Sequence, residues 1–229
     1  MDTAQITQGV IDHGPRCGHF GNLSPCLVAI EACGGAHHWA RELRKLGHTV
    51  RLLHAKIVRP FVSGNKTDAT DARAIWLAVQ QPGVKVVGIK STAQQATLTL
   101  RRQREALTKM RIMQTNALRG LLYEFGATFA KGKKALFKDV EATLERLANT
   151  LPQMVADSLR EQVARIRAIE VDMHAIEKHL QLQLTEDPQM LRVAQIPGVG
   201  LLTATAAIAT MADVMRYLVM IQGMLMVIR

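Results

Sequence analysis

The sequence predicts the fold class α/β plus α: an α/β region near the N-terminus followed by a longer region made only of helices. Before residue 90, short apolar runs alternate with a helical pattern, which is the order typical of a parallel strand–helix–strand unit. From residue 92 to about residue 185, strand signals disappear and apolar residues recur in steps of three and four. That spacing is typical of helices that pair along their length.

These patterns divide the chain into three regions, at residues 1–90, 91–188 and 189–229. The first region predicts five elements in order: a strand at 25–30, a helix at 37–46, a strand at 48–53, a helix at 68–81 and a strand at 84–89. Gly47 can end the first of these helices, and Pro82-Gly83 can stop the second. The first strand is expected to be buried, because most of its residues are apolar.

The second region predicts two long helices, at 92–124 and 152–184, joined by a Gly/Lys-rich turn and a shorter helix. This order favours an antiparallel helical hairpin. The later helix carries apolar residues at coiled-coil spacing, namely Leu159, Val163, Ile166, Ile169, Met173, Ile176 and Leu180. We therefore expect a long antiparallel helical coiled coil, through which copies of the chain form a homo-oligomer. The third region opens with the segment Ile196-Pro197-Gly198-Val199-Gly200 and continues as a helix of small residues.

The composition favours a polyanionic partner. The chain has 29 Lys and Arg against 19 Asp and Glu, a formal net charge of +10 and a pI near 10.0. A basic surface attracts phosphate backbones and releases their counterions on binding. No membrane partner is expected, because no apolar stretch is long enough to span a bilayer. The three cysteines, Cys17, Cys26 and Cys33, show no C-x-x-C pairing and fit a cytoplasmic location.

Three carboxylates are candidates for a metal site. Asp68 and Asp71 are three positions apart at the start of a predicted helix, so both lie on one face. Glu31 directly follows the apolar run of the first strand, at the edge where α/β sheets place their sites. Carboxylate oxygens suit Mg²⁺. The alternative is ordinary helix-start chemistry for the two aspartates, together with a solvated strand-end glutamate at position 31.

A basic helix is the main candidate for a nucleic-acid interface. Six basic residues and one acid, Glu105, lie between residues 101 and 119, and the six are Arg101, Arg102, Arg104, Lys109, Arg111 and Arg119. All six fall on about half of the helical circumference, and four apolar residues occupy the other half: Leu100, Leu107, Met110 and Leu118. Such a face indicates contact with phosphates. The alternative is a solvated surface.

Two further motifs are less specific. The I-P-G-V-G segment is similar to the turn of helix-hairpin-helix modules, in which glycines such as Gly198 and Gly200 let backbone N–H groups approach DNA phosphates. The same pattern also occurs in plain links between helices. His37 and His38 are adjacent on a predicted helix and point about 100° apart, which favours packing or surface roles over chelation of one metal.

Five blocks together resemble the DEDD insertion-sequence transposases, a family with a RuvC-like N-terminal domain, a coiled coil and a C-terminal domain that bears a catalytic serine. The blocks are residues 30–34, 36–43, 65–72, 119–126 and 196–200. The resemblance implies DNA transposition with Mg²⁺-assisted strand cleavage, guided in many members by a structured RNA that the element encodes. The expected fold is then an incomplete ribonuclease-H-like (RuvC-like) domain, the coiled coil and a partial C-terminal domain.

The resemblance also implies roles for individual residues. Glu31, Asp68 and Asp71 match the last three of the family's four acids, so the resemblance implies that they are catalytic and bind the metal. The first acid is missing, and Asp12 is the only nearby substitute. No serine follows Ser158. We therefore expect a transposase by descent that is truncated at both ends and catalytically inactive.

Two other classes of function stay open. The chain can be a non-catalytic helical protein that binds nucleic acid through the basic helix, or a purely structural coiled-coil protein. Substitution of Asp68 and Asp71 separates a nuclease from a binder. Binding that weakens with salt separates a binder from a structural protein.

Overall fold

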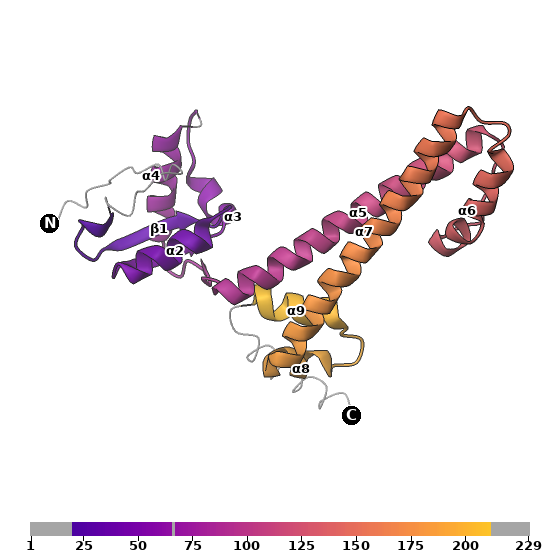
Figure 1. Ribbon diagram of the computed structural model, residues 1–229. Coiled ribbons are helices and arrows are strands. Elements are labelled where there is room, and N and C mark those ends of the chain that lie inside the picture. Colours follow the sequence, from indigo (N-terminus) through magenta and orange to yellow (C-terminus); the bar gives the residue numbers. More distant parts are fainter. Residues whose placement is uncertain (1–19, 66, 212–229) are drawn as a thin grey trace, which may run out of the picture. The chain divides into compact units, whose positions relative to one another are not determined.

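In the computed structural model, residues 20–65 and 67–211 are described, and the chain divides into two units with a boundary between Gln95 and Ala96 (Figure 1). The expected boundary lies five residues earlier, after residue 90. The segment beyond the last strand stays with the first unit, where Arg41 Nη1 donates a hydrogen bond of 2.7 Å to the carbonyl of Lys90.

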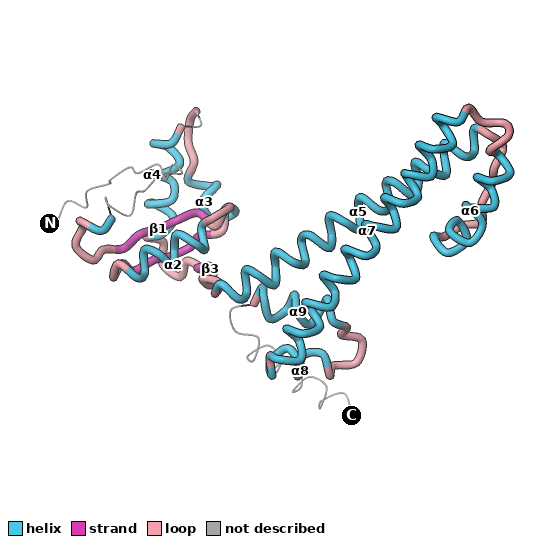
Figure 2. Tube along the Cα trace, viewed as in Figure 1, coloured by secondary structure: helices cyan, strands magenta, loops and turns pink. Residues whose placement is uncertain are grey.

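The first unit contains a three-stranded sheet in the order β1-β2-β3 (Figure 2). Strands β1 (Leu27–Glu31) and β2 (Thr49–Leu53) pair in parallel, with Leu27 opposite Thr49. A parallel pair needs a crossover, which helix α2 (Ala36–Lys45) supplies, and the predicted strand–helix–strand unit is confirmed. Strand β3 (Val86–Val87) is antiparallel to β2 and shorter than expected.

The expectation of a buried first strand is wrong. Leu27 is 48% exposed, and the rest of β1 is half-buried. The physical reason is the position of β1 at the edge of the sheet that the described residues form, where β2 is its one neighbouring strand.

Alternation along β2 places its side chains in two cores, one on each face of the sheet. Val50 and Leu52 pack with Ala40 and Leu43 of α2. Leu53 packs instead with residues of helix α3 (Ala55–Val58), the short 3₁₀ helix η1 (Arg59–Phe61) and helix α4 (Asp68–Val79). Helix α2 therefore covers one face of the sheet, and α3, η1 and α4 cover the other.

The second unit is helical and contains most of α5 (Thr92–Glu124), then α6 (Lys133–Leu147), α7 (Gln153–Glu186), α8 (Pro188–Ala194) and α9 (Leu201–Thr210). Helices α5 and α7 lie side by side and run antiparallel (Figure 1). Thr97 near the start of α5 bonds to Gln183 near the end of α7. Farther along α5, Gln114 accepts a hydrogen bond from Gln162 near the start of α7. The predicted antiparallel hairpin is confirmed.

The predicted apolar positions of α7 are confirmed, since five of the seven are buried and Ile169 and Ile176 are half-buried. The four apolar residues opposite the basic face of α5 are not equally buried. Of the four only Leu118 is buried, whereas Met110 is 51% exposed. The buried residues of α5 are Thr97, Thr115, Leu118 and Leu122. Thr97 and Thr115 lie five full helical turns apart, and the other two follow in steps of three and four, so all four share one face. Helix α5 therefore turns a partly polar stripe toward α7.

The main core of the second unit lies where α6 folds back along the hairpin. Leu122 of α5, Leu136 and Leu144 of α6, and Ile166 of α7 are all at most 1% exposed there. A second cluster joins Leu184 of α7 to α8 and α9. Helices α8 and α9 both pack against α7, and the boundary expected at residue 189 stays a prediction. No helix within residues 20–65 and 67–211 is long and apolar enough to cross a membrane.

Candidate functional site

Glu31 is the last residue of β1, where its backbone lies opposite Leu53 of β2. The chain continues the pairing for one more residue, as Ala32 N donates to the carbonyl of Leu53 at 2.8 Å. The side chain of Glu31 is half-exposed. Helix α4, which carries the two aspartates, packs against β1. The sequence therefore predicted correctly that Glu31 ends a strand of the sheet.

Asp68 and Asp71 lie in the first turn of α4, but neither of them caps the helix. Thr67 is the N-cap: its hydroxyl accepts from Thr70 N at 3.2 Å, and Thr67 N donates to the Thr70 hydroxyl at 3.0 Å. The alternative in which an aspartate side chain caps the helix is therefore wrong. Both carboxylates still lie near the positive end of the helix dipole, with Asp68 exposed and Asp71 half-buried.

The three acids do not form a metal-binding cluster. Within residues 20–65 and 67–211, no three His, Cys, Asp or Glu side chains are grouped closely enough to hold an ion. Carboxylate oxygens are the ligands that Mg²⁺ prefers, so the residue types of Glu31, Asp68 and Asp71 suit the metal while their arrangement does not. The fourth candidate acid, Asp12, lies outside the described residues. No metal-dependent step follows from this arrangement.

The histidines have packing roles, as expected for His37 and His38. His37 Nδ1 accepts from Lys90 N at 3.2 Å, and the exposed ring of His38 lies edge-on to Trp39. The sequence pattern did not single out His48 as a buried residue, yet it is only 4% exposed. Its Nδ1 accepts from Cys26 N at 3.2 Å, so its Nε2 donates to the carbonyl of Phe20 at 2.9 Å. His48, which precedes β2, is therefore bonded to the segment that precedes β1.

Three of the six basic residues of α5 have partners within the hairpin. Arg104 pairs with Glu177 of α7 at 2.7 Å, and Arg111 lies 3.5 Å from Glu170 of the same helix. Arg119 donates to backbone carbonyls of the segment between α5 and α6, including that of Ala130 at 2.9 Å. These three side chains are half-buried. Part of the basic face is therefore engaged inside the protein, and the binding of all six residues to nucleic acid stays a prediction.

The other three basic residues differ. Lys109 is exposed and pairs with Glu105 one helical turn earlier at 2.7 Å, and this hydrogen bond from Lys109 lowers the pKa of the Glu105 carboxyl. Arg101 and Arg102 have no ion-pair partner in the part of the chain that the structure describes. Arg102 is exposed, whereas Arg101 is half-buried. Among the described residues, these two cations of α5 therefore form no ion pair, and Arg101 acts on Glu105 only through its charge.

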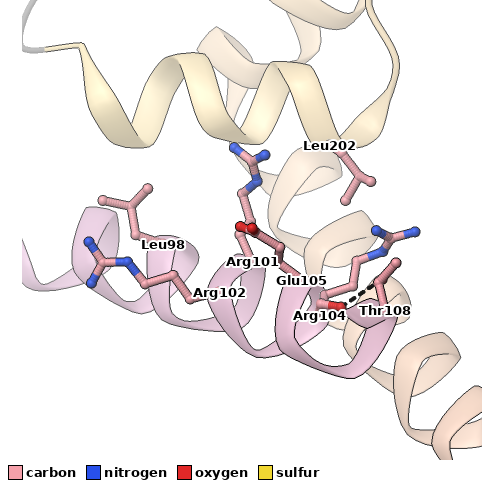
Figure 3. Close-up of a pocket in the computed structure, with 7 residues that line it drawn as sticks. All are labelled: Leu98, Arg101, Arg102, Arg104, Glu105, Thr108 and Leu202. Carbon is pink, nitrogen blue, oxygen red and sulfur yellow. Dashed lines mark hydrogen bonds between the residues drawn. The ribbon is translucent and has the colours of Figure 1, made fainter. Parts of the chain in front are cut away.

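A pocket of about 420 Å³ lies beside these arginines, between α5 and α9 (Figure 3). Its lining residues are Leu98, Arg101, Arg102, Arg104, Glu105, Thr108 and Leu202. Leu202 belongs to the first turn of α9, the helix that follows the I-P-G-V-G segment. The fold thus brings the basic part of α5 to the helix after the glycine turn, although the two segments are far apart in the sequence.

The glycine turn itself is open. Gly198 adopts a φ of +84°, a left-handed conformation in which a side chain is strained. A Cβ at Gly198 or at Gly200 would meet no atom within 4 Å. The Gly200 carbonyl accepts from Ala204 N at 2.9 Å and so begins α9. The turn therefore leaves its backbone open to approach by a ligand, while its role in binding stays a prediction.

Comparisons with known proteins agree on one family. Residues 17–126 match the family model of the DEDD, IS110-type transposases. A probable family 20 transposase of Pseudomonas aeruginosa is 38% identical over 199 residues, covering 86% of this chain and 59% of the relative. The transposase of insertion sequence element IS1328 from Yersinia enterocolitica is 35% identical over 199 residues, with coverages of 85% and 57%.

A third relative, the transposase of insertion sequence element IS1111A from Coxiella burnetii, is 34% identical over 204 residues, with coverages of 86% of this chain and 54% of the relative. The chain therefore spans between 50% and 59% of the length of the curated relatives that it matches. The match to the family model covers the sheet unit and the whole of α5, and the likeness to the relatives extends over most of the chain. The chain belongs to this family of insertion-sequence transposases.

Proposed function

We propose that this chain acts on DNA as part of an insertion-sequence transposase, and that its helical unit holds the DNA backbone. The observation that carries the proposal is the meeting of α5 and α9, where Arg101, Arg102 and Arg104 line one pocket beside the start of a helix. Both partly exposed arginines and helix N-termini favour phosphate oxygens. The formal net charge of +10 adds a long-range attraction for a polyanion.

The second part of the proposal is that this chain alone does not cleave DNA. In the family's Mg²⁺-dependent reaction Glu31, Asp68 and Asp71 would be the ligands, and their carboxylates form no ion pair in the described part of the chain. Because the three are not gathered into a metal-binding group, we expect these acids alone to support no cleavage. The chain would then bind DNA without cutting it, as in the non-catalytic alternative.

Self-association is a further part of the proposal. Large apolar side chains remain exposed along the two long helices, among them Met110 and Met113 of α5 and Val171 and Leu182 of α7, which are between 51% and 69% exposed. Such residues on the outside of a helical pair favour a coiled coil with a second copy of the chain.

An element-encoded guide RNA would present the same phosphate chemistry to the basic residues as DNA does.

The binding experiment titrates the full chain into a fluorescent DNA duplex of about 30 base pairs at several salt concentrations between about 50 and 200 mM. We expect the logarithm of the affinity to fall linearly with the logarithm of the salt concentration, by about 0.9 for each phosphate contacted. A purely structural coiled-coil protein would show no affinity at the lowest salt concentration. That outcome would refute the proposed DNA binding.

The cleavage experiment incubates the same duplex and a supercoiled plasmid with the chain and Mg²⁺ or Mn²⁺. We expect no nicking. Nicking that disappears in the Asp68→Asn, Asp71→Asn double variant, while binding is unchanged, would show that the acids assemble into an active site and would refute the non-catalytic form of the proposal.

Size-exclusion chromatography with light scattering tests for the homo-oligomer. A monomer at all protein concentrations would contradict self-association.

A further inference from the structure

The pocket between α5 and α9 contains an unsatisfied cationic donor. The Nε atom of Arg101 is buried and has no hydrogen-bond partner within residues 20–65 and 67–211. Figure 3 shows the Arg101 side chain reaching from α5 toward α9. A buried donor on a charged group costs free energy until an acceptor reaches it. Among the described residues, the Nε donor of Arg101 is therefore buried with its hydrogen-bonding capacity unused.

The charged side chains around the pocket differ in whether they already form an ion pair. Arg104 is bound to Glu177 through both Nε and Nη2, each 2.7 Å from the same carboxylate oxygen. The Glu105 carboxylate is held by Lys109, so its charge is partly neutralised. Within the described residues Arg101 and Arg102 form no ion pair, although Arg101 is near enough to Glu105 to help lower the pKa of its carboxyl. The pocket is therefore electropositive, with two cations available to a ligand.

The shape and chemistry of the lining restrict the ligand. Guanidinium groups offer planar pairs of donors that match the oxygens of a phosphate. Leu98 and Leu202 add apolar surface on the α5 and α9 sides, which excludes water and strengthens a charge-assisted hydrogen bond. A metal cation is disfavoured by the same arginines. A phosphate group that enters from the outside meets these requirements.

We propose that Arg101 binds a phosphate of the DNA backbone in the pocket between α5 and α9, with Arg102 as the second cation. This proposal rests on the proposed DNA binding and names one site for it. In this arrangement Arg104 is a positioning residue: its pair with Glu177 fixes the turn of α5 that presents Arg101. The fold, not the linear sequence, selects Arg101 among the six basic residues of the helix.

The test compares Arg101→Gln with Arg165→Gln, a control that removes one positive charge from an exposed position on α7. Binding of the full chain to the duplex is measured by fluorescence anisotropy across the salt series. We expect Arg101→Gln to weaken binding roughly tenfold at low salt and to reduce the salt slope by about one. Arg165→Gln should change the affinity by less than about twofold, because a single distant charge acts only through a screened field.

The other outcomes separate a failure of the pocket proposal from a failure of the proposed DNA binding. Equal losses in the two variants would show only a general charge effect and would overturn the pocket proposal, while the salt-dependent binding of the unmodified chain would leave the proposed function intact. A loss confined to an RNA hairpin tested in parallel would overturn the assignment to DNA. If the unmodified chain does not bind the duplex at all, the proposed function fails first. Circular dichroism checks that Arg101→Gln keeps its helices. Should it unfold, Arg101→Lys carries the test, and unchanged affinity in that variant overturns the proposal.

Discussion

The pair of Arg104 and Glu177 joins the two long helices at a position where a helical pair usually buries apolar residues. The side chains are 23% and 32% exposed, and Arg104 contacts one carboxylate oxygen of Glu177 through two nitrogens at 2.7 Å. The contribution of an ion pair to the free energy of unfolding depends on how far its charges are buried. We therefore predict the outcome of a double-mutant cycle with Arg104→Met and Glu177→Leu.

The magnitude lies between two limits. Exposed ion pairs contribute about 0–1 kcal/mol, whereas breaking a fully buried pair costs about 3–5 kcal/mol because one charge stays buried without its partner. At about a quarter to a third exposed, each single substitution should cost about 1.5 kcal/mol of unfolding free energy. The double variant should cost less than about 1 kcal/mol, since an apolar pair can replace the charges, which leaves a coupling energy of roughly 2 kcal/mol.

Urea denaturation followed by far-ultraviolet circular dichroism measures these free energies for all four proteins. The matched control is Arg160→Met, which removes one partner of the exposed pair with Asp157 on α7 and should cost less than about 0.5 kcal/mol. A coupling energy below about 0.3 kcal/mol, or single variants no more costly than the control, would show that Arg104 and Glu177 do not stabilise the helical pair as expected. The pair would then behave as a surface contact despite its burial.

Three further predictions concern stability. Ile166→Ala removes a side chain with 0% exposure from the core of the hairpin and should lower the unfolding free energy by about 2–5 kcal/mol in urea denaturation; a cost below about 1 kcal/mol would mean that this core is loosely packed. Thr67→Ala removes the hydroxyl that accepts from Thr70 N and should cost about 1 kcal/mol by thermal unfolding, whereas no change would mean that an aspartate takes over the cap. Gly198→Ala places a side chain at a φ of +84° and should cost about 1–2 kcal/mol, and a neutral result would show that the turn changes conformation freely.

Features that depend on neighbours in the sequence were predictable. The long helix at 92–124 has the bounds expected for α5, and five of the seven apolar residues predicted along α7 are buried. The parallel pairing of β1 and β2 also followed from the order of strand, helix and strand. In each case the signal is a local periodicity, which the backbone geometry of a helix or strand imposes on nearby side chains.

The functional candidates were harder to place, because a residue type does not state its partner. Asp68 looked like a capping residue, yet Thr67 and Thr70 form the cap. On α5, six basic residues looked equivalent, yet Arg104 is engaged by an acid 73 positions later while Arg101 is left unpaired. Nothing in the sequence near these residues distinguishes one arginine from the next.

From the sequence alone one can read the two classes of structure, the bounds of the long helices, the excess of positive charge and the likeness to transposases. Three features depend on how distant segments pack: α5 turns a partly polar stripe toward α7, Glu31, Asp68 and Asp71 are not grouped as metal ligands, and α5 and α9 line a basic pocket. The difference comes from the range of the interactions involved. Periodicity is fixed within a few residues, whereas burial and ion pairing depend on which distant segments pack together.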